Sequence, residues 1–401
     1  MKKFISALLY VTQKVYYILL SQKSLKLWIF CSSQCKTFIA FHIAVFTFIS
    51  LFASVYAAPP IAEKPDIKVV INGKIRTFQS VPIIVNGHTL LPLRDMLSKL
   101  DVANDDSHII WNGNENSVKI IKDNISVYLK VDSTSATLNG DDITLDAAPV
   151  NYKSHVYIPA RFVSQSLGKK VVWDAASSSV LIKDEKDFDT ITKIIGEANV
   201  AMKDVKKFKV GAAADVCIDL KDESRDFDIT ASMEFDDAKD LSHMIMNYKT
   251  DDNEFSIEFY RVNKISYMKN PVTGKWSVSP DKSGSKDVIS GNGGTGSSQI
   301  DSSDILTAGL MADTSNPDEI VLKGDVYNSD ILKSLKSFEN ITGFNTEIHI
   351  DSKTNYITKV ISKVTSEGKP QSFEMNFSDF NGSDIDIKIP GEVKNILGNS
   401  L

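Results

Sequence analysis

A repeat in the N-terminal half of the chain limits most strongly what this sequence can fold into. The first copy aligns with the second without a gap at an offset of 67 positions, and beyond Leu100 and Leu167 the offset becomes 62. The aligned segments are Ile71-Asn72-Gly73 with Leu138-Asn139-Gly140, Leu91-Pro92-Leu93-Arg94 with Ile158-Pro159-Ala160-Arg161, and Trp111 with Trp173. Because one register holds across Asn-Gly, Pro-x-Arg and Trp, the region contains two copies of one supersecondary unit.

Each copy predicts the same order of elements, ββαββ. An Asn-Gly pair supplies a hairpin turn, a proline opens a helix where its missing N–H costs nothing, and a closing hairpin carries the tryptophan. Neither copy has enough apolar residues for more than a one-sided core, so we expect the two to pack together. We expect structural roles for six repeat positions: Pro92, Arg94, Trp111, Pro159, Arg161 and Trp173.

The repeated arginines and histidines could also bind a ligand or a metal. Arg94 and Arg161 fall in the first turn of the predicted helices, where a cation gains nothing from the helix dipole. We therefore expect a carboxylate or a tryptophan face to hold each arginine, and we favour this structural role over ligand binding. His88 and His155 are equivalent by repeat, and we favour duplicated turn-flanking residues over metal ligands.

The segments that carry the repeat, VNGHTLLPLRDMLSKL and HVYIPARFVSQSLGKKVVWD, resemble the stalk domain named after the N-terminal domain of copper amine oxidases. The resemblance covers about residues 67–183, with copies over 67–122 and 134–183. It implies a stalk or surface module, common on exported proteins of Gram-positive bacteria, and not oxidase chemistry.

The motifs of an amine oxidase are absent from this sequence. The family forms its quinone from a tyrosine in a Thr-x-x-Asn-Tyr-acid motif, whereas each Asn-Tyr pair here is followed by Lys or Ile. The sequence contains no His-x-His pair, and copper needs a convergent set of imidazoles. We expect no catalytic residue, no metal site, no cofactor and no enzymatic activity.

The N-terminal segment is typical of an export signal. Residues 1–57 contain six lysines and no acidic residue, and an apolar run over residues 37–58 ends in Val55-Tyr56-Ala57. The segment is either a cleaved signal peptide or a retained signal anchor, and residues 58–66 form a proline-containing linker. Both alternatives place residues 58–401 outside the cytoplasmic membrane. The net charge of −6 becomes −12 for this exterior part, which argues against nucleic acid as a partner.

Residues 187–395 predict a curved antiparallel sheet with helices, so the fold class is α+β and rich in strands. An apolar stripe from Phe188 to Val205 predicts a helix, and strict alternation predicts long strands after it. Further helices are expected at Asp304–Met311 and Asp330–Phe338, a last strand at Ile385–Ile389, and a flexible loop at 279–303.

This C-terminal region resembles the LolA/LppX-like fold. The segments that carry the resemblance are the leading helix, Ile265-Ser266-Tyr267-Met268-Lys269, Ile350-Asp351-x-Lys353-Thr354 and a closing Ile387-x-Ile389-Pro390. Relatives with this fold use an open half-barrel to carry acyl chains or to sense the envelope. If the resemblance holds, a ligand would meet Val210, Ala212, Met233, Ile257 and Phe259, although an ordinary closed core also explains these residues.

Two functions remain open from the sequence. The first is a non-enzymatic envelope protein whose stalk presents a LolA-like domain for a lipid or acyl ligand or an envelope partner. The alternative is a purely structural protein that adheres to a cell-wall component and has no ligand cavity. The sequence does not indicate an oligomeric state.

Overall fold

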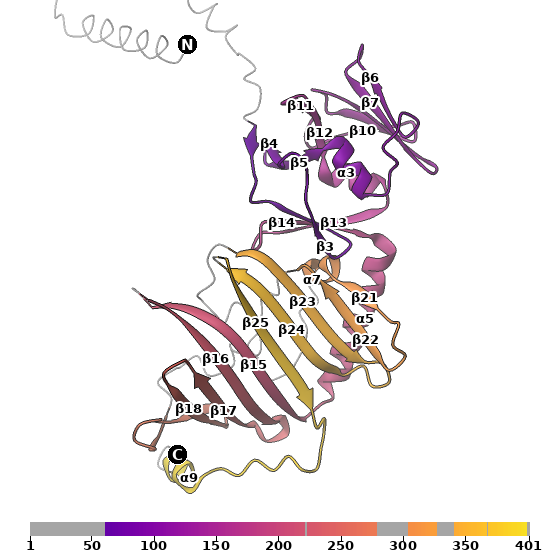
Figure 1. Ribbon diagram of the computed structural model, residues 1–401. Helices are drawn as coiled ribbons and strands as arrows, with labels where there is room; N and C mark the ends of the chain where they lie inside the picture. The colour runs from indigo at the N-terminus through magenta and orange to yellow at the C-terminus, as the bar shows by residue number, and fades with distance from the viewer. Residues whose placement is uncertain (1–60, 221–222, 279–303, 327–340, 367, 399–401) are drawn as a thin grey trace, which may run out of the picture. The chain divides into compact units, whose positions relative to one another are not determined.

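The computed structural model describes residues 61–220, 223–278, 304–326, 341–366 and 368–398. The expected export segment, the loop at 279–303 and the helix expected at Asp330–Phe338 lie outside these residues. The described part is rich in strands with a few helices and a curled sheet, which confirms the α+β class (Figure 1). Among its helices, none has both the length and the apolar content needed to cross a membrane.

The two copies of the repeat meet in a shared central sheet. The inner strands pair antiparallel in a register that sets Leu91 opposite Ile158, its own equivalent in the repeat, so a pseudo-twofold axis passes between them. The central sheet runs in the order β1 (Ala62–Glu63), β4 (Ile83–Val85), β5 (His88–Pro92), β12 (His155–Pro159) and β11 (Val150–Tyr152).

The copies also exchange their opening hairpins. The opening hairpin of copy one joins the closing hairpin of copy two, through the parallel pair β2–β14, in a sheet that we call the docked sheet. Its order is β13 (Lys169–Asp174), β14 (Ser179–Asp184), β2 (Lys68–Ile71) and β3 (Lys74–Arg76). The closing hairpin of copy one and the opening hairpin of copy two also share a sheet, the counterpart sheet, but there β8 lies between them. Its order is β10 (Asp141–Thr144), β9 (Ser135–Leu138), β8 (Ile125–Lys130), β7 (Ser117–Lys122) and β6 (Ile109–Asn112).

The predicted repeat is correct in outline, with one hairpin more than ββαββ in each copy. The helices are α3 (Leu93–Lys99) and α4 (Ala160–Ser166), each directly preceded by the predicted proline. Both Asn-Gly turns have positive φ, as hairpin turns require. The additional hairpins are β4–β5 and β11–β12. One buried cluster includes residues of both copies, such as Leu97, Ile109, Val163 and Ile182, so neither copy has a core of its own.

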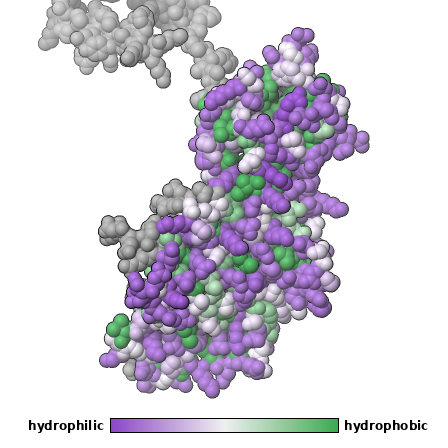
Figure 2. Space-filling view, viewed as in Figure 1, coloured by the Kyte–Doolittle hydropathy of each residue, from purple (hydrophilic) through white to green (hydrophobic). Residues whose placement is uncertain are grey.

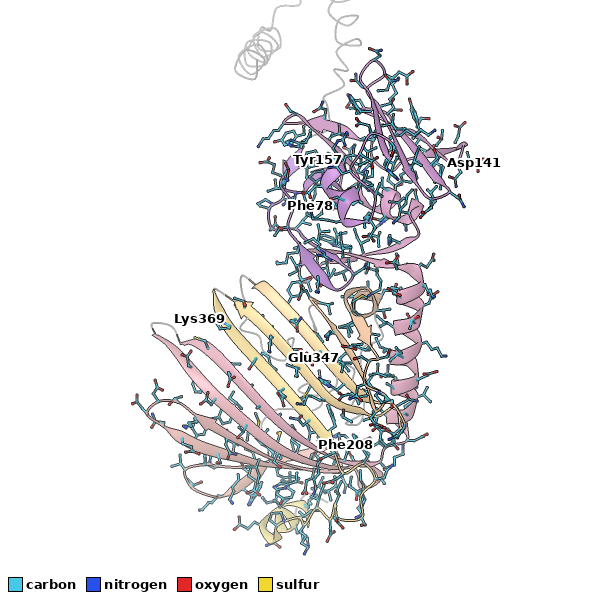
Figure 3. The ribbon with its side chains drawn as sticks, turned by 45° about the vertical axis from the view of Figure 1, so that its right-hand side comes forward. Phe78, Asp141, Tyr157, Phe208, Glu347 and Lys369 are labelled. Carbon is cyan, nitrogen blue, oxygen red and sulfur yellow. The ribbon has the colours of Figure 1, made fainter. Side chains whose placement is uncertain are left out.

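An eleven-stranded antiparallel sheet forms the C-terminal region. Two meanders join where β15 pairs with β25, and Figure 3 shows Phe208 and Lys369 at opposite ends of the long strands. The strands are, in sheet order, β20 (Trp276–Val278), β19 (Ile265–Lys269), β18 (Glu254–Val262), β17 (Leu241–Lys249), β16 (Glu223–Asp236), β15 (Lys207–Leu220), β25 (Lys369–Ser378), β24 (Ile357–Ser366), β23 (Ile341–Asp351), β22 (Glu319–Gly324) and β21 (Met311–Asp313). A 3-10 turn (Asp237–Lys239) joins β16 to β17.

The apolar stripe of helix α5 (Glu185–Lys203) covers one face of this sheet. Ile191, Ile195 and Met202 are buried against Phe208 and Ile348, and α7 (Asp304–Gly309) packs into the same cluster. We call the face that carries α5 the inner face. Because helical residues at three- and four-residue spacing share one side, the stripe predicted from the sequence is the side that packs.

The C-terminal segment corrects one prediction. Residues 385–390 pair with no strand, although their alternation predicts a strand at Ile385–Ile389. Ile385 and Ile387 instead pack with Val393 of α9 (Gly391–Gly398) on the outer face of the sheet, against Tyr260 and Tyr267. Alternating apolar residues show only that one side of an extended segment is buried. An unpaired segment that packs on a surface meets this condition as well as a strand does.

The docked sheet packs on the C-terminal region through an apolar cluster. Val70 and Leu181 of this sheet are fully buried with Phe188 of α5 and Ala308 of α7. Nearby, Lys183 is 0% exposed, and its ammonium donates to the carbonyl of Leu310. Burial lowers the pKa of Lys183 to about 8, against the opposing influence of Asp187 and Asp184.

Glycines let the Asn72-Gly73 turn approach this junction closely. A Cβ on Gly73 would lie 2.8 Å from Cγ of Met311, and a Cβ on Gly324 would lie 2.0 Å from the carbonyl oxygen of Gly309. The backbone N–H of Asp325 donates to the carbonyl of Gly73 over 2.8 Å, and Oδ2 of Asp325 accepts the N–H of Ile75 over 2.8 Å. The stalk and the sheet are therefore joined by packing and by backbone hydrogen bonds as well as by the chain itself.

Candidate functional site

The five residues predicted to meet a ligand all lie on the inner face of the sheet. Val210 is paired with Met233, and the same transverse row continues through Met244 to Phe259. Ala212 lies in the next row, which continues through Ala231 and Met246 to Ile257. The strand register thus brings the five residues into two adjacent rows.

Burial falls along these rows away from α5. Val210 is 1% exposed and Met233 5%, and both belong to the cluster packed under the helix. Ala212, Ile257 and Phe259 are only half-buried, and Phe255, one row further, is 42% exposed. The inner face is therefore a closed core beneath α5 and a partly exposed apolar surface on β17 and β18.

Sequence reasoning missed the methionines that extend this surface. Met244 and Met246 on β17, Met268 on β19 and Met375 on β25 are half-buried and in register with the predicted residues. Tyr248 stacks on Phe255 with ring centroids 4.9 Å apart. Alternation alone could not indicate this face, because Met244-Ile245-Met246 is apolar on both sides of its strand. Unbranched, polarizable side chains of this kind adapt to irregular apolar shapes.

The outer face of the same strands is charged. Lys209 lies 3.8 Å from Glu234, and His243 Nε2 lies 3.0 Å from Glu258, whose second oxygen is 3.1 Å from the ammonium of Lys269. The surface in view in Figure 2 is likewise mostly hydrophilic, with hydrophobic residues in small scattered areas. One sheet thus presents an ionic side and an apolar side.

Metal-ligating side chains are scattered in the part of the chain that the structure describes. None of them forms a group of three or more His, Cys, Asp and Glu residues that could hold a metal ion. Burial raises the pKa of Cys217, so its thiol remains protonated and is a poor nucleophile.

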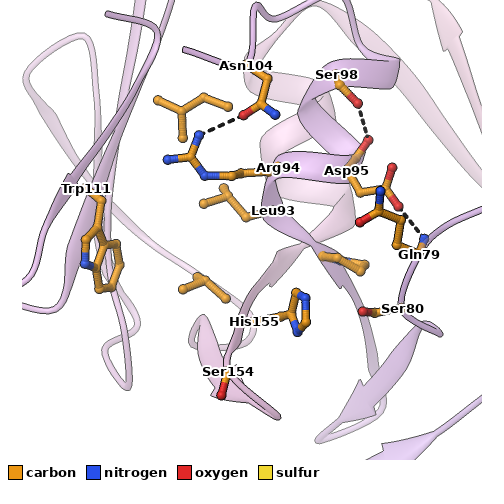
Figure 4. Close-up of a pocket in the computed structure, with 13 residues that line it drawn as sticks. Gln79, Ser80, Leu93, Arg94, Asp95, Ser98, Asn104, Trp111, Ser154 and His155 are labelled. Carbon is orange, nitrogen blue, oxygen red and sulfur yellow. Dashed lines mark hydrogen bonds between the residues drawn. The ribbon is translucent and has the colours of Figure 1, made fainter. Parts of the chain in front are cut away.

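Three of the six repeat positions of the stalk line a pocket of about 510 Å³ (Figure 4). Its walls come from α3 and β6 of copy one and from the β11–β12 hairpin of copy two. The lining includes three of the repeat positions, Pro92, Arg94 and Trp111, together with His155 of the other copy. His155 is brought to this pocket by the pairing of β12 with β5 in the central sheet, which sequence spacing alone could not show.

The two arginines differ in their surroundings. Arg94 donates from Nη1 to the side-chain oxygen of Asn104 over 2.7 Å, and its Nη2 lies 4.0 Å from Asp106. Arg161 is exposed and, within the described residues, has neither a hydrogen bond nor an ion pair. A carboxylate thus lies near Arg94, although an amide holds it more closely.

The remaining repeat positions are also split between buried and exposed. Pro92 and Pro159 are buried and pair across the pseudo-twofold axis with Tyr157 and Leu90. Trp111 and Trp173 are 40% and 42% exposed. His155 donates from Nδ1 to the carbonyl oxygen of Lys153 over 3.0 Å, which matches a turn-flanking residue.

Two protein-family models match parts of this chain. Residues 70–182 match the copper amine oxidase N-terminal domain, which confirms the resemblance of the repeat region. Only that domain of the amine oxidases is matched. Residues 190–302 match a family of unknown function (DUF6612). No curated protein matches the chain.

Solved structures that resemble the C-terminal half include two mycobacterial proteins. LprF from Mycobacterium bovis is 11% identical with a TM-score of 0.30, and the match covers 51% of this chain and 97% of LprF. The lipoprotein LppX of Mycobacterium tuberculosis is 11% identical with a TM-score of 0.28, covering 49% of this chain and 99% of LppX. A LolA superfamily protein from Nitrosomonas europaea is 8% identical with a TM-score of 0.19, covering 50% and 95%. At these identities and TM-scores the similarities carry no argument about a ligand or a role of this chain.

Proposed function

We propose that this protein is an exported, non-enzymatic component of the cell envelope, and that its C-terminal sheet binds a lipophilic ligand on the inner face. The observation that carries the proposal is the apolar surface on β17 and β18 that lies outside the cluster packed under α5 and is only partly buried. It is formed by Met246, Tyr248, Phe255, Ile257 and Phe259. An apolar surface that is neither packed nor fully solvated gains free energy when an apolar ligand covers it.

Export rests on the sequence of the first 57 residues. Lysines precede the apolar run and acidic residues dominate after it, so the folded part would lie on the outer side of the cytoplasmic membrane, whether secreted or anchored. In this proposal the stalk presents the sheet at the envelope and supplies no chemistry.

Two isoleucines on neighbouring strands provide a matched test. Ile257 faces inward beside Met246, whereas Ile245 faces outward beside Glu258, and both are half-buried. In the full chain, Ile257→Lys is expected to weaken displacement of a fluorescent fatty acid ~10-fold or more, because a lysine ammonium would be desolvated by the acyl chain. Ile245→Lys is expected to leave it within about twofold.

Native mass spectrometry of the full chain checks the same proposal without a probe. Co-purified lipid is expected with the wild type and with Ile245→Lys, and less with Ile257→Lys. Equal binding by both variants, or a protein that takes up no fatty acid at all, would contradict the ligand site. Retention on cell wall by such a protein would instead support the purely structural alternative.

A further inference from the structure

The pocket in the stalk is separate from the inner face of the sheet and has a different chemistry. Its volume of about 510 Å³ lies within the roughly 300–1,000 Å³ of small-molecule sites. Leu93, Ile109 and Val156 provide apolar area, while Ser154 and His155 provide polar groups from the other copy. The position between two copies gives it walls on both sides.

Trp111 provides a flat, partly exposed ring on one wall. The ring is 40% exposed, and within the described residues its indole N–H has no acceptor. A large aromatic side chain with an unused donor at its edge suits a ligand that has both an apolar face and hydroxyl groups. A pyranose ring has these two properties, because its C–H groups form a face and its hydroxyls lie around the rim.

Arg94 places a positive charge in the pocket, and no carboxylate of the lining pairs with it. The other charged residue of the lining, Asp95, accepts from the backbone of Gln79 over 2.7 Å and from the ammonium of Lys99. Arg94 uses Nη1 for Asn104, and the carboxylate of Asp106, 4.0 Å from Nη2, is fully exposed. The guanidinium therefore keeps donors for a ligand carboxylate, which it can bind in a bidentate manner. Figure 4 shows Arg94 extended between Trp111 and Asn104.

The residues equivalent to Arg94 and Trp111 in copy two have different surroundings. Asn104 lies in the segment between helix and closing hairpin, which is five residues longer in copy one, as the change of offset from 67 to 62 requires. Arg161 and Trp173 repeat the side chains without this segment. They therefore form a natural control within the same chain.

We propose that the stalk pocket binds an acidic sugar, a pyranose that carries a carboxylate, with its ring on Trp111 and its carboxylate on Arg94. This site is independent of the lipophilic ligand proposed for the sheet. A free sugar acid and the acidic residue of a glycan share this chemistry.

Calorimetry on the full chain with glucuronic acid, glucose and inorganic phosphate tests the proposal. Glucuronic acid is expected to bind, and glucose is expected to bind ~10-fold more weakly because it lacks the carboxylate. Arg94→Gln is expected to remove this preference, and Trp111→Ala to weaken both sugars ~10-fold. Both side chains are about half exposed, so loss of the fold is not expected, and circular dichroism verifies it. An acidic oligosaccharide that binds more tightly than glucuronic acid would identify a glycan as the source.

Arg161→Gln and Trp173→Ala are the matched controls and are expected to leave binding within about twofold. Phosphate that binds as well as glucuronic acid, with no effect of Trp111→Ala, would show an anion site and overturn the sugar assignment. Absence of binding by all three compounds, or equal loss in the copy-one and copy-two variants, would also overturn it. Because the fatty-acid assay reads the other region, failure here leaves the proposed function untouched.

Discussion

The docked sheet and the counterpart sheet contain equivalent strands of the repeat but differ in surface: one is apolar and buried, and the other is largely polar and exposed. On the docked sheet, Val70, Ile75, Leu181 and Val172 are buried or half-buried. At the equivalent positions the counterpart sheet has Thr137, Asp142, Lys119 and Ile110, of which the last three are exposed. Equivalent strands of the two sheets therefore differ in their side chains, and they differ in pairing as well, because β14 pairs directly with β2 whereas β8 lies between β7 and β9. Only the docked sheet has the apolar surface that packs on the C-terminal region.

The largest expected change in stability comes from exchanging the side chains of two equivalent positions, Leu181 of the docked sheet and Lys119 of the counterpart sheet. Leu181→Lys would place an ammonium in the cluster with Val70, Phe188 and Ala308, and should lower the free energy of unfolding by about 3 kcal/mol or more. The reciprocal change, Lys119→Leu, alters an exposed position and should stay within ~0.5 kcal/mol. Urea denaturation of both variants measures the difference, and similar values would refute the asymmetry of the two ends.

A smaller effect is expected from the two equivalent turn glycines. Gly73 and Gly140 both have positive φ, 73° and 97°, so alanine at either position costs about 1 kcal/mol in the backbone. A Cβ meets no atom within 4 Å at Gly140, whereas at Gly73 it would lie 2.8 Å from Met311 Cγ and 3.3 Å from Gly309 O. Gly73→Ala should therefore cost about 1–3 kcal/mol more than Gly140→Ala. Thermal unfolding of the two variants isolates the junction, because the backbone cost cancels.

The smallest expected effect is a pH dependence that only the docked sheet has. Burial lowers the pKa of Lys183 to about 8 from the ordinary 10.5, whereas its counterpart is Ile121. Between about pH 8 and 10.5 the unfolded chain retains a proton that the folded chain has lost, so stability rises with pH through this window. The rise should be on the order of 1 kcal/mol and absent in Lys183→Met. Denaturation midpoints at pH 7.5 and 10 measure it, and an equal rise in the variant would assign it to other groups.

Local patterns in the sequence predicted most elements of this fold. The repeat, its Asn-Gly turns and its proline-led helices depend on interactions between near neighbours, and the apolar stripe of α5 depends on helical spacing alone. Alternation was misleading at Ile385–Ile389 because it reports one buried side and not a pairing partner.

Contacts between segments far apart in the chain could not be predicted from the sequence. The approach of Gly309 to Gly324 and the exchange of hairpins depend on the packing of segments far apart in the chain. The same holds for the stalk pocket, where His155 of copy two faces Arg94 and Trp111 of copy one. The repeat identified these positions, but to predict that they line one pocket requires knowledge that β12 pairs with β5.

The exchange of opening hairpins also has a consequence for how the chain folds. Lys68 pairs with Ser179, so β2 has no partner on its β14 side until the last strand of copy two is available. A chain that emerges with its N-terminus first holds this edge open while more than a hundred residues follow, which is a loop closure of high contact order. We therefore expect the docked sheet to close only after the last strand of copy two, immediately before α5 begins, whereas the counterpart sheet consists of strands that are consecutive in the chain.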